Sequence, residues 1–228
     1  LVAEARLVGS LEHPNIIPVH AVGRDHRGLP LLVMKRVEGV AWSELLDDPN
    51  HPAWSRDELA SEDRLAAHLQ ILMQVANAVH FANTRGVVHR DVKPGNVMVG
   101  PFGEVYLLDW GMALRRGTTP RAGFFGTPAY MAPEMLKGDV DAIDARTDVY
   151  LLGATLHEIL TGQRRHAATS LLDALTSAQV SAPFPYDAEV PRELAELCNA
   201  ATHPDPERRP ASAAVFRHAT SYASRRKY

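Results

Sequence analysis

Three polar strings in this 228-residue sequence carry side chains that could do chemistry. The first is HRDVKPGN at His89–Asn96, the second LLDWG at Leu107–Gly111, and the third APE at Ala132–Glu134. The first holds a carboxylate, an ammonium group and an amide, with a Pro94-Gly95 turn that would let these side chains converge. Moving a phosphoryl group from a nucleotide to a hydroxyl needs an oriented hydroxyl, a divalent metal on the phosphates, and nearby positive charge. The strings predict that chemistry.

In this order and spacing, the strings resemble the catalytic loop, the metal-binding turn and the end of the activation segment of protein kinases, especially bacterial Ser/Thr kinases. A solvated polar turn between two strands would explain the first string alone, but not the two behind it. The resemblance runs from Glu4 to about Phe216. It implies an α+β, protein-kinase-like fold, with a partial N-lobe of a helix and short antiparallel strands at residues 1–37. Residues 38–223 would form a mainly α-helical C-lobe.

The resemblance implies a catalytic role for five residues. Asp91 would orient the acceptor hydroxyl and receive its proton, and Lys93 would contact the γ-phosphate of ATP. Asn96 and Asp109 would bind Mg²⁺, an ion that prefers hard oxygen ligands. Glu4, in the string AEARL, occupies the position of the helix glutamate that pairs with a strand lysine in kinases.

The resemblance also places the nucleotide between the two lobes. Met34 would be the gatekeeper, and the hinge Lys35-Arg36-Val37 would bind the adenine base through its backbone. Glu38 would approach the ribose, and Met98 would lie under the adenine ring. From residue type alone, Met34 and Met98 are more often ordinary core residues.

The expected partner is a protein with a Ser or Thr acceptor. Lys93, two places after Asp91, resembles Ser/Thr kinases more than tyrosine kinases, and so does the string GTP that contains Thr127. Thr127 would hydrogen-bond Asp91 and Lys93 and shape the acceptor site.

Phosphorylation of the chain itself is one of two expectations for the loop after Asp109. Thr118 and Thr119 are the candidate phosphosites, because a phosphate there could pair with Arg90. An unmodified, flexible loop is the alternative.

Other residues are expected to support the site. By resemblance, Glu134 and Arg209 form a buried ion pair beneath the activation segment. His89 would support the loop from the core, next to Trp110, which replaces the usual Phe of the kinase DFG string. Asp148 opens an apolar helix, either as its N-cap or as an anchor for the catalytic-loop backbone.

Composition narrows the class of protein. The net charge of −3 gives no reason to propose nucleic acid or a membrane surface as partner. A lone Cys198 excludes a disulfide framework and predicts a reducing cytoplasm. The best apolar run, Val149–Leu160, is too short to cross a bilayer and contains His157 and Glu158.

Hydrophobic patterning predicts the elements that position these residues. Apolar runs at 16–22 and 29–37 predict an antiparallel strand pair, and apolar repeats over 65–79 predict a long helix. Residues 148–161 are apolar on nearly every side, as in a fully buried helix. Short β-rich runs at 87–89, 97–99 and 105–108 and helices at 192–202 and 211–223 follow the same reasoning. The polar segment 47–62 predicts an exposed loop.

Two parts of the kinase pattern are missing. No G-x-G-x-x-G string occurs, and neither Lys35 nor Lys93 can replace the strand lysine that should pair with Glu4. Losing one preorganised charge-stabilising donor commonly raises a reaction barrier by roughly 3–4 kcal/mol. The chain begins with Leu1, as a piece of a longer protein would, and we expect it to be weakly active or inactive as given.

Two other functions compete with a Ser/Thr kinase. A pseudokinase that serves as a regulatory binding scaffold is the main alternative, but it has no need of Asp91, Lys93, Asn96 and Asp109 together. A small-molecule kinase of the antibiotic-phosphotransferase type shares the chemistry. The APE and GTP strings favour a protein substrate over that class, because in kinases they build a platform for protein substrates.

Overall fold

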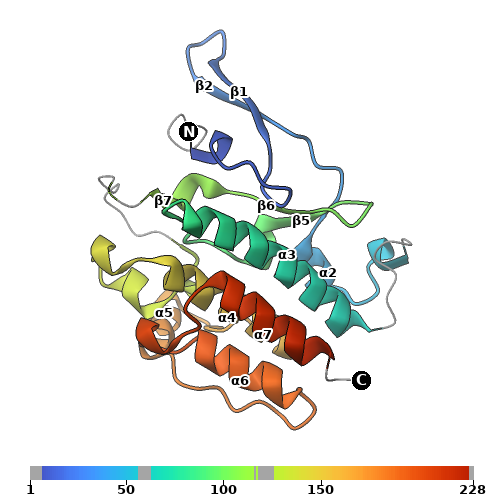
Figure 1. Cartoon of the computed structure of the whole chain (residues 1–228), viewed down its shortest axis with the longest axis vertical. Helices are drawn as coiled ribbons and strands as arrows, with labels where there is room; N and C mark the ends of the chain where they lie inside the picture. The colour runs from blue at the N-terminus through green and yellow to red at the C-terminus, as the bar shows by residue number, and fades with distance from the viewer. Residues whose placement is uncertain (1–6, 56–62, 116, 118–125, 226–228) are drawn as a thin grey trace.

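The computed structural model describes residues 7–55, 63–115, 117 and 126–225. Figure 1 shows a slender β hairpin above a larger helical body, with short strands between them. Glu4, Thr118 and Thr119 lie outside the described residues.

The hairpin pairs β1 (Val19–Arg24) with β2 (Pro30–Met34) in antiparallel register. Its turn is closed by the Asp25 carboxylate, which accepts hydrogen bonds from the backbone N–H groups of Arg27 and Leu29 at 2.9 and 2.8 Å. The predicted strand pair is confirmed, with strands shorter than the apolar runs. Ahead of it, Leu7–Gly9 are helical, which is the described part of the expected first helix.

Short strands carry the polar strings at their ends. β3 (Val40–Ala41), β5 (Val97–Val99) and β6 (Val105–Leu107) form one antiparallel sheet in the order β3-β5-β6. β4 (Val87–Val88) pairs with β7 (Leu114–Arg115). The first string therefore connects β4 to β5, and the second connects β6 to β7. Because β5 pairs with β6 and β4 pairs with β7, both strings run between the same two sheets.

The helical body is built around α3 (Arg64–Thr84) and α4 (Ala145–Thr161). α3 packs against α4 and α7 (Ala213–Arg225), and α4 packs against α6 (Arg192–Ala201). Figure 1 shows α3, α7 and α6 as neighbouring layers, with α5 (Leu171–Val180) at their side. Most of α4 is buried, as its apolar composition predicted. Among the described helices, none combines the length and apolar character that a bilayer crossing requires.

The start of α4 differs from one of the two expectations. Its N-cap is Asp144, whose side chain accepts a hydrogen bond from the Arg146 N–H at 2.7 Å, and Thr147 completes a capping box. Asp148 lies inside the helix and is not its cap. The left-handed Gly162, at φ 69°, ends the helix.

The segment 47–62 is not simply an exposed loop. After α2 (Trp42–Asp47), residues Pro52–Ser55 form a 3-10 turn that buries Ala53 and Trp54. The Trp54 ring meets His68 edge-on at 5.1 Å, and the Arg64 guanidinium lies 4.5 Å over it. One aromatic side chain thus anchors a segment whose polar composition predicted exposure; residues 56–62 lie outside the described part.

Candidate active site

The loop that follows β4 is held from below by a buried carboxylate. Asp148 accepts hydrogen bonds from the backbone N–H groups of His89 at 2.9 Å and Arg90 at 3.0 Å, and from Asn83 Nδ2 at 2.8 Å. Arg90 adopts the left-handed conformation with φ 67°, which costs a non-glycine residue about 1–3 kcal/mol. Burial raises the pKa of Asp148, while its N–H donors favour the charged form. Asp148 therefore fixes the backbone path of the loop.

His89 is a buried support. The backbone N–H of Asp91 donates to His89 Nδ1 at 3.2 Å, so the proton of a neutral ring sits on Nε2 and is donated to the Leu108 carbonyl at 3.0 Å. The ring packs edge-on against Trp110, with centroids 4.5 Å apart. Burial lowers the pKa of His89, which keeps the ring neutral. With both nitrogens engaged and no exposed surface, His89 cannot serve as a proton acceptor for a substrate.

Three side chains converge on the carboxylate of Asp91, which is only 2% exposed. Lys93 Nζ lies 2.8 Å from Oδ2, and Thr127 Oγ1 lies 2.8 Å from Oδ1. Asn96 Nδ2 donates to Oδ2 at 2.7 Å and to the Asp91 carbonyl oxygen at 2.8 Å. Lys93 Nζ also contacts Thr127 Oγ1, which closes a ring of polar contacts. The structure thus brings together four of the residues predicted from the sequence.

Asp109 stands beside this cluster with its side chain open to solvent. It has φ 56° and ψ 69°, and its carboxylate accepts a hydrogen bond from the Gly111 N–H at 3.4 Å. In the part of the chain that the structure describes, no hydrogen bond or ion pair joins Asp109 to Asp91, Lys93 or Asn96. The backbone N–H of the preceding Leu108 donates to the Asn96 carbonyl at 2.8 Å, which sets the position of Asp109 relative to the loop.

Asn96 and Asp109 offer oxygen atoms that fit a hard cation. Both hydrogens of Asn96 Nδ2 are used on Asp91, so the amide oxygen points away from that carboxylate. No cluster of three or more His, Cys, Asp or Glu side chains that could hold a metal occurs within the described residues. Two oxygen donors suit an ion that keeps water and phosphate oxygens as its other ligands, as Mg²⁺ does.

The residues expected to hold adenine lie around the end of β2 and on β5. Met34 ends β2 and is 42% exposed, and Met98 is half-buried on β5, opposite Tyr106 of β6. Lys35 contacts the Tyr106 hydroxyl, with Nζ 4.6 Å from the ring centre. This contact ties the segment after β2 to the sheet that carries Met98.

The next two expected nucleotide residues are more exposed. Val37 is half-buried, and Glu38 is exposed with its carboxylate 4.0 Å from the Arg36 guanidinium. Among the described residues, no hydrogen bond or ion pair links either side chain to Met98 or to Asp91.

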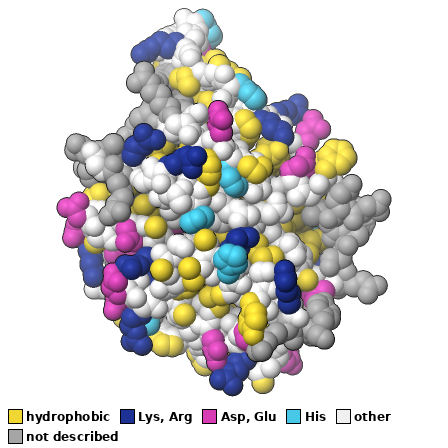
Figure 2. Space-filling model, in the orientation of Figure 1, with side chains coloured by type: hydrophobic (Ala, Val, Ile, Leu, Met, Phe, Trp, Pro, Cys, Tyr) yellow, Lys and Arg dark blue, Asp and Glu magenta, His cyan; other side chains and the backbone are white. Residues whose placement is uncertain are grey.

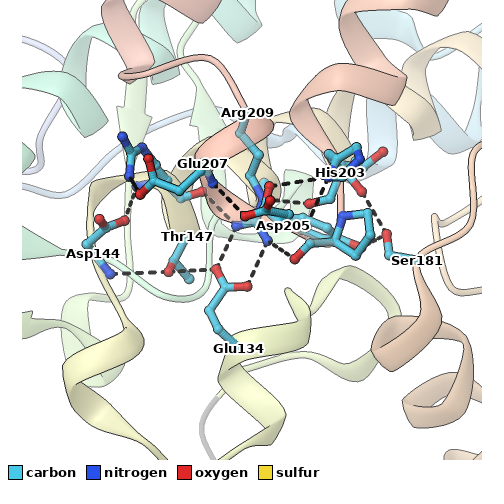
Figure 3. A network of polar contacts seen from close by, with 12 residues as sticks. Glu134, Asp144, Thr147, Ser181, His203, Asp205, Glu207 and Arg209 are labelled. Atoms are coloured by element: carbon cyan, nitrogen blue, oxygen red, sulfur yellow. Dashed lines mark hydrogen bonds and ion pairs between the residues drawn. The ribbon is translucent and has the colours of Figure 1, made fainter.

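Glu134 and Arg209 form the expected ion pair, with side chains 4% and 0% exposed. Figure 3 shows the two groups facing each other, with Arg209 N–H groups donating to both Glu134 oxygens at 2.6 and 2.8 Å. Thr147 of α4 adds a hydrogen bond to Glu134 at 2.9 Å. Arg209 further donates to the His203 carbonyl at 2.7 Å. The pair fastens the APE string to α4 and to the segment before α7.

Arg90 has a buried side chain whose Nε donates to the Met112 carbonyl. Burial lowers the pKa of its guanidinium, although Asp148 acts in the opposite direction. The pairing of Arg90 with a phosphate on Thr118 or Thr119 stays a prediction, because both threonines lie outside the described residues.

Sequence reasoning missed three residues that build the site. Asn83 binds both Asp148 and the Val87 carbonyl, and Thr147 completes the Glu134 pair. Glu158 accepts a hydrogen bond from Tyr130, just after Thr127, at 2.7 Å. Apart from the contact between Asn83 and Val87, which are four positions apart, these contacts join residues 13 to 65 positions apart, and no local pattern marks them.

Comparisons with known proteins agree with this geometry. The protein kinase domain family matches residues 1–220. The chain is 33% identical over 169 residues to serine/threonine-protein kinase PknB of Mycobacterium leprae, an alignment that covers 70% of this chain and 25% of the relative. It is 32% identical over 225 residues to the probable serine/threonine-protein kinase SCO3848 of Streptomyces coelicolor, covering 94% of this chain and 32% of the relative.

A third relative, serine/threonine-protein kinase PknD of Chlamydia muridarum, is 30% identical over 250 residues, covering 95% of this chain and 26% of the relative. The chain therefore spans about a quarter to a third of the length of these relatives. Because the family match extends over nearly the whole sequence and includes all three polar strings, the chain belongs to the protein kinase family.

Proposed function

We propose that this chain transfers the γ-phosphoryl group of ATP to Ser or Thr hydroxyls of a protein, with Mg²⁺ as the metal. The observation that carries the proposal is the convergence of Lys93, Thr127 and Asn96 on the buried carboxylate of Asp91. The family uses ATP and a divalent metal in general, and the oxygen donors of Asn96 and Asp109 favour Mg²⁺ over softer ions.

In the proposed reaction the acceptor hydroxyl attacks the γ-phosphorus while the bond to the bridging oxygen of ADP breaks. Asp91 orients the hydroxyl and takes its proton, a role worth about 10²–10⁴ in rate. Lys93 supplies positive charge to the phosphate oxygens, and its contact with Asp91 holds it near the acceptor. Mg²⁺ would be held by Asn96 and Asp109 and would neutralise charge on the phosphates.

Thr127 supports a Ser or Thr acceptor. Its hydroxyl bridges Lys93 and Asp91, so the segment after Gly126 is drawn against the catalytic carboxylate. The names of the relatives, all serine/threonine-protein kinases, agree with this preference.

The chain as given turns over slowly, because its sequence contains no Gly-rich phosphate loop. It works in a reducing cytoplasm, since its single cysteine, Cys198, is buried and has no second cysteine to pair with.

The test is incubation of the chain with γ-labelled ATP, Mg²⁺ and casein, followed by analysis of the labelled amino acids. We expect slow labelling of Ser and Thr that stops when EDTA removes the metal. Labelling confined to Tyr would contradict the proposed acceptor. Binding of ATP with no labelling of casein or of the chain would contradict slow turnover by this chain and favour the scaffold alternative.

A further inference from the structure

The helical body contains a groove of about 560 Å³ whose lining residues do not belong to the site described above. It lies between the end of α4, the start of α3 and the connection from α5 to α6, which Figure 1 shows running along the lower edge of the molecule. Its volume falls in the range of about 300–1,000 Å³ that is typical of binding pockets. The residues that matter to its chemistry are Ile159, Leu160, Phe184, Tyr186, Asp187 and Glu189.

The aromatic wall of the groove is held in place by partly buried polar contacts. His157 Nδ1 lies 2.8 Å from the Tyr186 hydroxyl, which donates to Cys198 Sγ at 2.7 Å. The Phe184 backbone is clamped by Asn199, which accepts from its N–H at 2.8 Å and donates to its carbonyl at 3.0 Å. The Phe184 and Tyr186 rings meet at 5.0 Å. A connection with no regular secondary structure is thereby preorganised, which lowers the entropy lost when a ligand binds.

The charged side chains that line the groove are both negative. Asp187 and Glu189 line it and are exposed, and neither has an ion-pair partner among the residues that the structure describes. No lysine or arginine is among the lining residues. Three cations near the groove have other partners: Arg164 lies 4.0 Å from Glu158, Arg192 lies 2.7 Å from Glu196, and the buried Arg165, which lies behind the wall, donates to the Ala182 carbonyl.

We propose that this groove binds an extended segment of another protein in which an arginine stands next to a bulky apolar residue. A guanidinium group can stack on an aromatic ring and pair with a carboxylate through two hydrogen bonds, and the wall and rim of the groove offer both partners. The apolar neighbour would fill the space beside Ile159 and Leu160. An apolar centre with a polar, solvent-accessible rim is the arrangement found at protein–protein interfaces. Binding in this groove does not depend on phosphoryl transfer, so the inference goes beyond the proposed function.

The test uses a fluorescein-labelled eight-residue peptide of alternating arginine and leucine, with binding to the whole chain followed by fluorescence anisotropy. The double variant Asp187→Asn, Glu189→Gln should weaken binding at least about tenfold, because each substitution removes a charge-assisted hydrogen bond. The control variant Glu12→Gln, Asp141→Asn removes the same charge from exposed residues outside the groove and should bind as the parent chain does. Amide NMR shifts on peptide addition should concentrate at residues 159–163 and 184–191.

Several results would overturn the proposal. If a peptide of alternating glutamate and leucine bound as tightly as the arginine peptide, the charges of Asp187 and Glu189 would have no part in recognition. Amide shifts centred on other residues would place the bound peptide outside the groove. Light scattering that shows a dimer, lost in the Asp187→Asn, Glu189→Gln variant, would assign the groove to a second copy of this chain. Transfer of phosphate to casein should be the same for this variant and the parent, so the outcome here is separate from that of the proposed function.

Discussion

Thr127 donates its hydroxyl hydrogen to Asp91 across 2.8 Å, although 36 residues separate the two positions in the sequence. The same hydroxyl contacts Lys93, whose ammonium group lies 2.8 Å from the other carboxylate oxygen. The segment that contains Thr127 is thus fastened to the carboxylate of Asp91 in the loop after β4. In the proposed reaction, the position of this segment therefore depends on the Thr127 hydroxyl.

Replacing that hydroxyl tests the contact. Thr127→Ala should lower the rate of phosphate transfer to casein about tenfold or more, because Asp91 loses a hydrogen bond to a charged group worth about 1.5–3 kcal/mol. Thr127→Ser keeps the hydroxyl and should retain most of the rate. Equal rates for the Ala variant and the parent chain would show that the contact has no part in catalysis.

Asp148 is predicted to matter because the backbone N–H groups of His89 and Arg90, in the loop after β4, both donate to its carboxylate. In Asp148→Asn one acceptor oxygen becomes an NH₂ group that faces a backbone donor, so the free energy of unfolding should fall by about 1–3 kcal/mol. Urea denaturation measures this change.

Asp144→Asn is the matched control for that variant, because asparagine caps a helix about as well as aspartate does. It lies four residues away on the same helix and should leave stability nearly unchanged. The account of the loop anchor would be wrong if the two variants unfolded at the same urea concentration.

The buried ion pair of Glu134 and Arg209 is predicted to contribute more to stability than the exposed ion pair of Glu207 and Arg146. Glu134→Gln leaves the Arg209 charge buried without its partner and should cost about 3–5 kcal/mol. Glu207→Gln removes the partner of Arg146 at an exposed site, where an ion pair contributes about 0–1 kcal/mol. Thermal unfolding of both variants measures the difference, and similar losses would contradict the assigned burial.

Two buried histidines predict how stability changes with pH. Burial, aided by Arg64 for His68 and by Arg165 for His157, lowers the pKa of each to about 4 from the usual 6.5. Between pH 6.5 and about 4 the unfolded chain therefore binds more protons than the folded one, and the free energy of unfolding falls as the pH falls. Above pH 6.5 this contribution is fully present.

Urea denaturation at several pH values from 7.5 to about 4 measures this slope. His68→Gln should unfold with a shallower dependence on pH across the same window, since one proton-binding difference is removed. An unchanged slope in this variant would show that His68 is protonated equally in both states.

Asp91, Lys93 and Asn96 could be expected to lie together because they stand within one short string, and the strand pair and buried helix followed from local apolar patterns. The resemblance also gave Thr127 and Asp148 as partners of this loop. Other partners could not be predicted. Asn83 meets Asp148 across 65 positions, and Lys35 meets Tyr106 across 71, so neither contact leaves a local trace. The burial of Trp54 was not expected either, because the residues around it in the segment 47–62 are mostly polar and predicted an exposed loop.

The most direct test of the central claim compares phosphate transfer to casein by the parent chain and by Asp91→Asn, with ATP binding measured for both. Because the substitution keeps the shape of the side chain and removes its ability to take a proton, ATP binding should persist while the rate falls at least about 100-fold. Undiminished transfer by Asp91→Asn would contradict the assignment of Asp91 as the catalytic carboxylate and, with it, this account of the site.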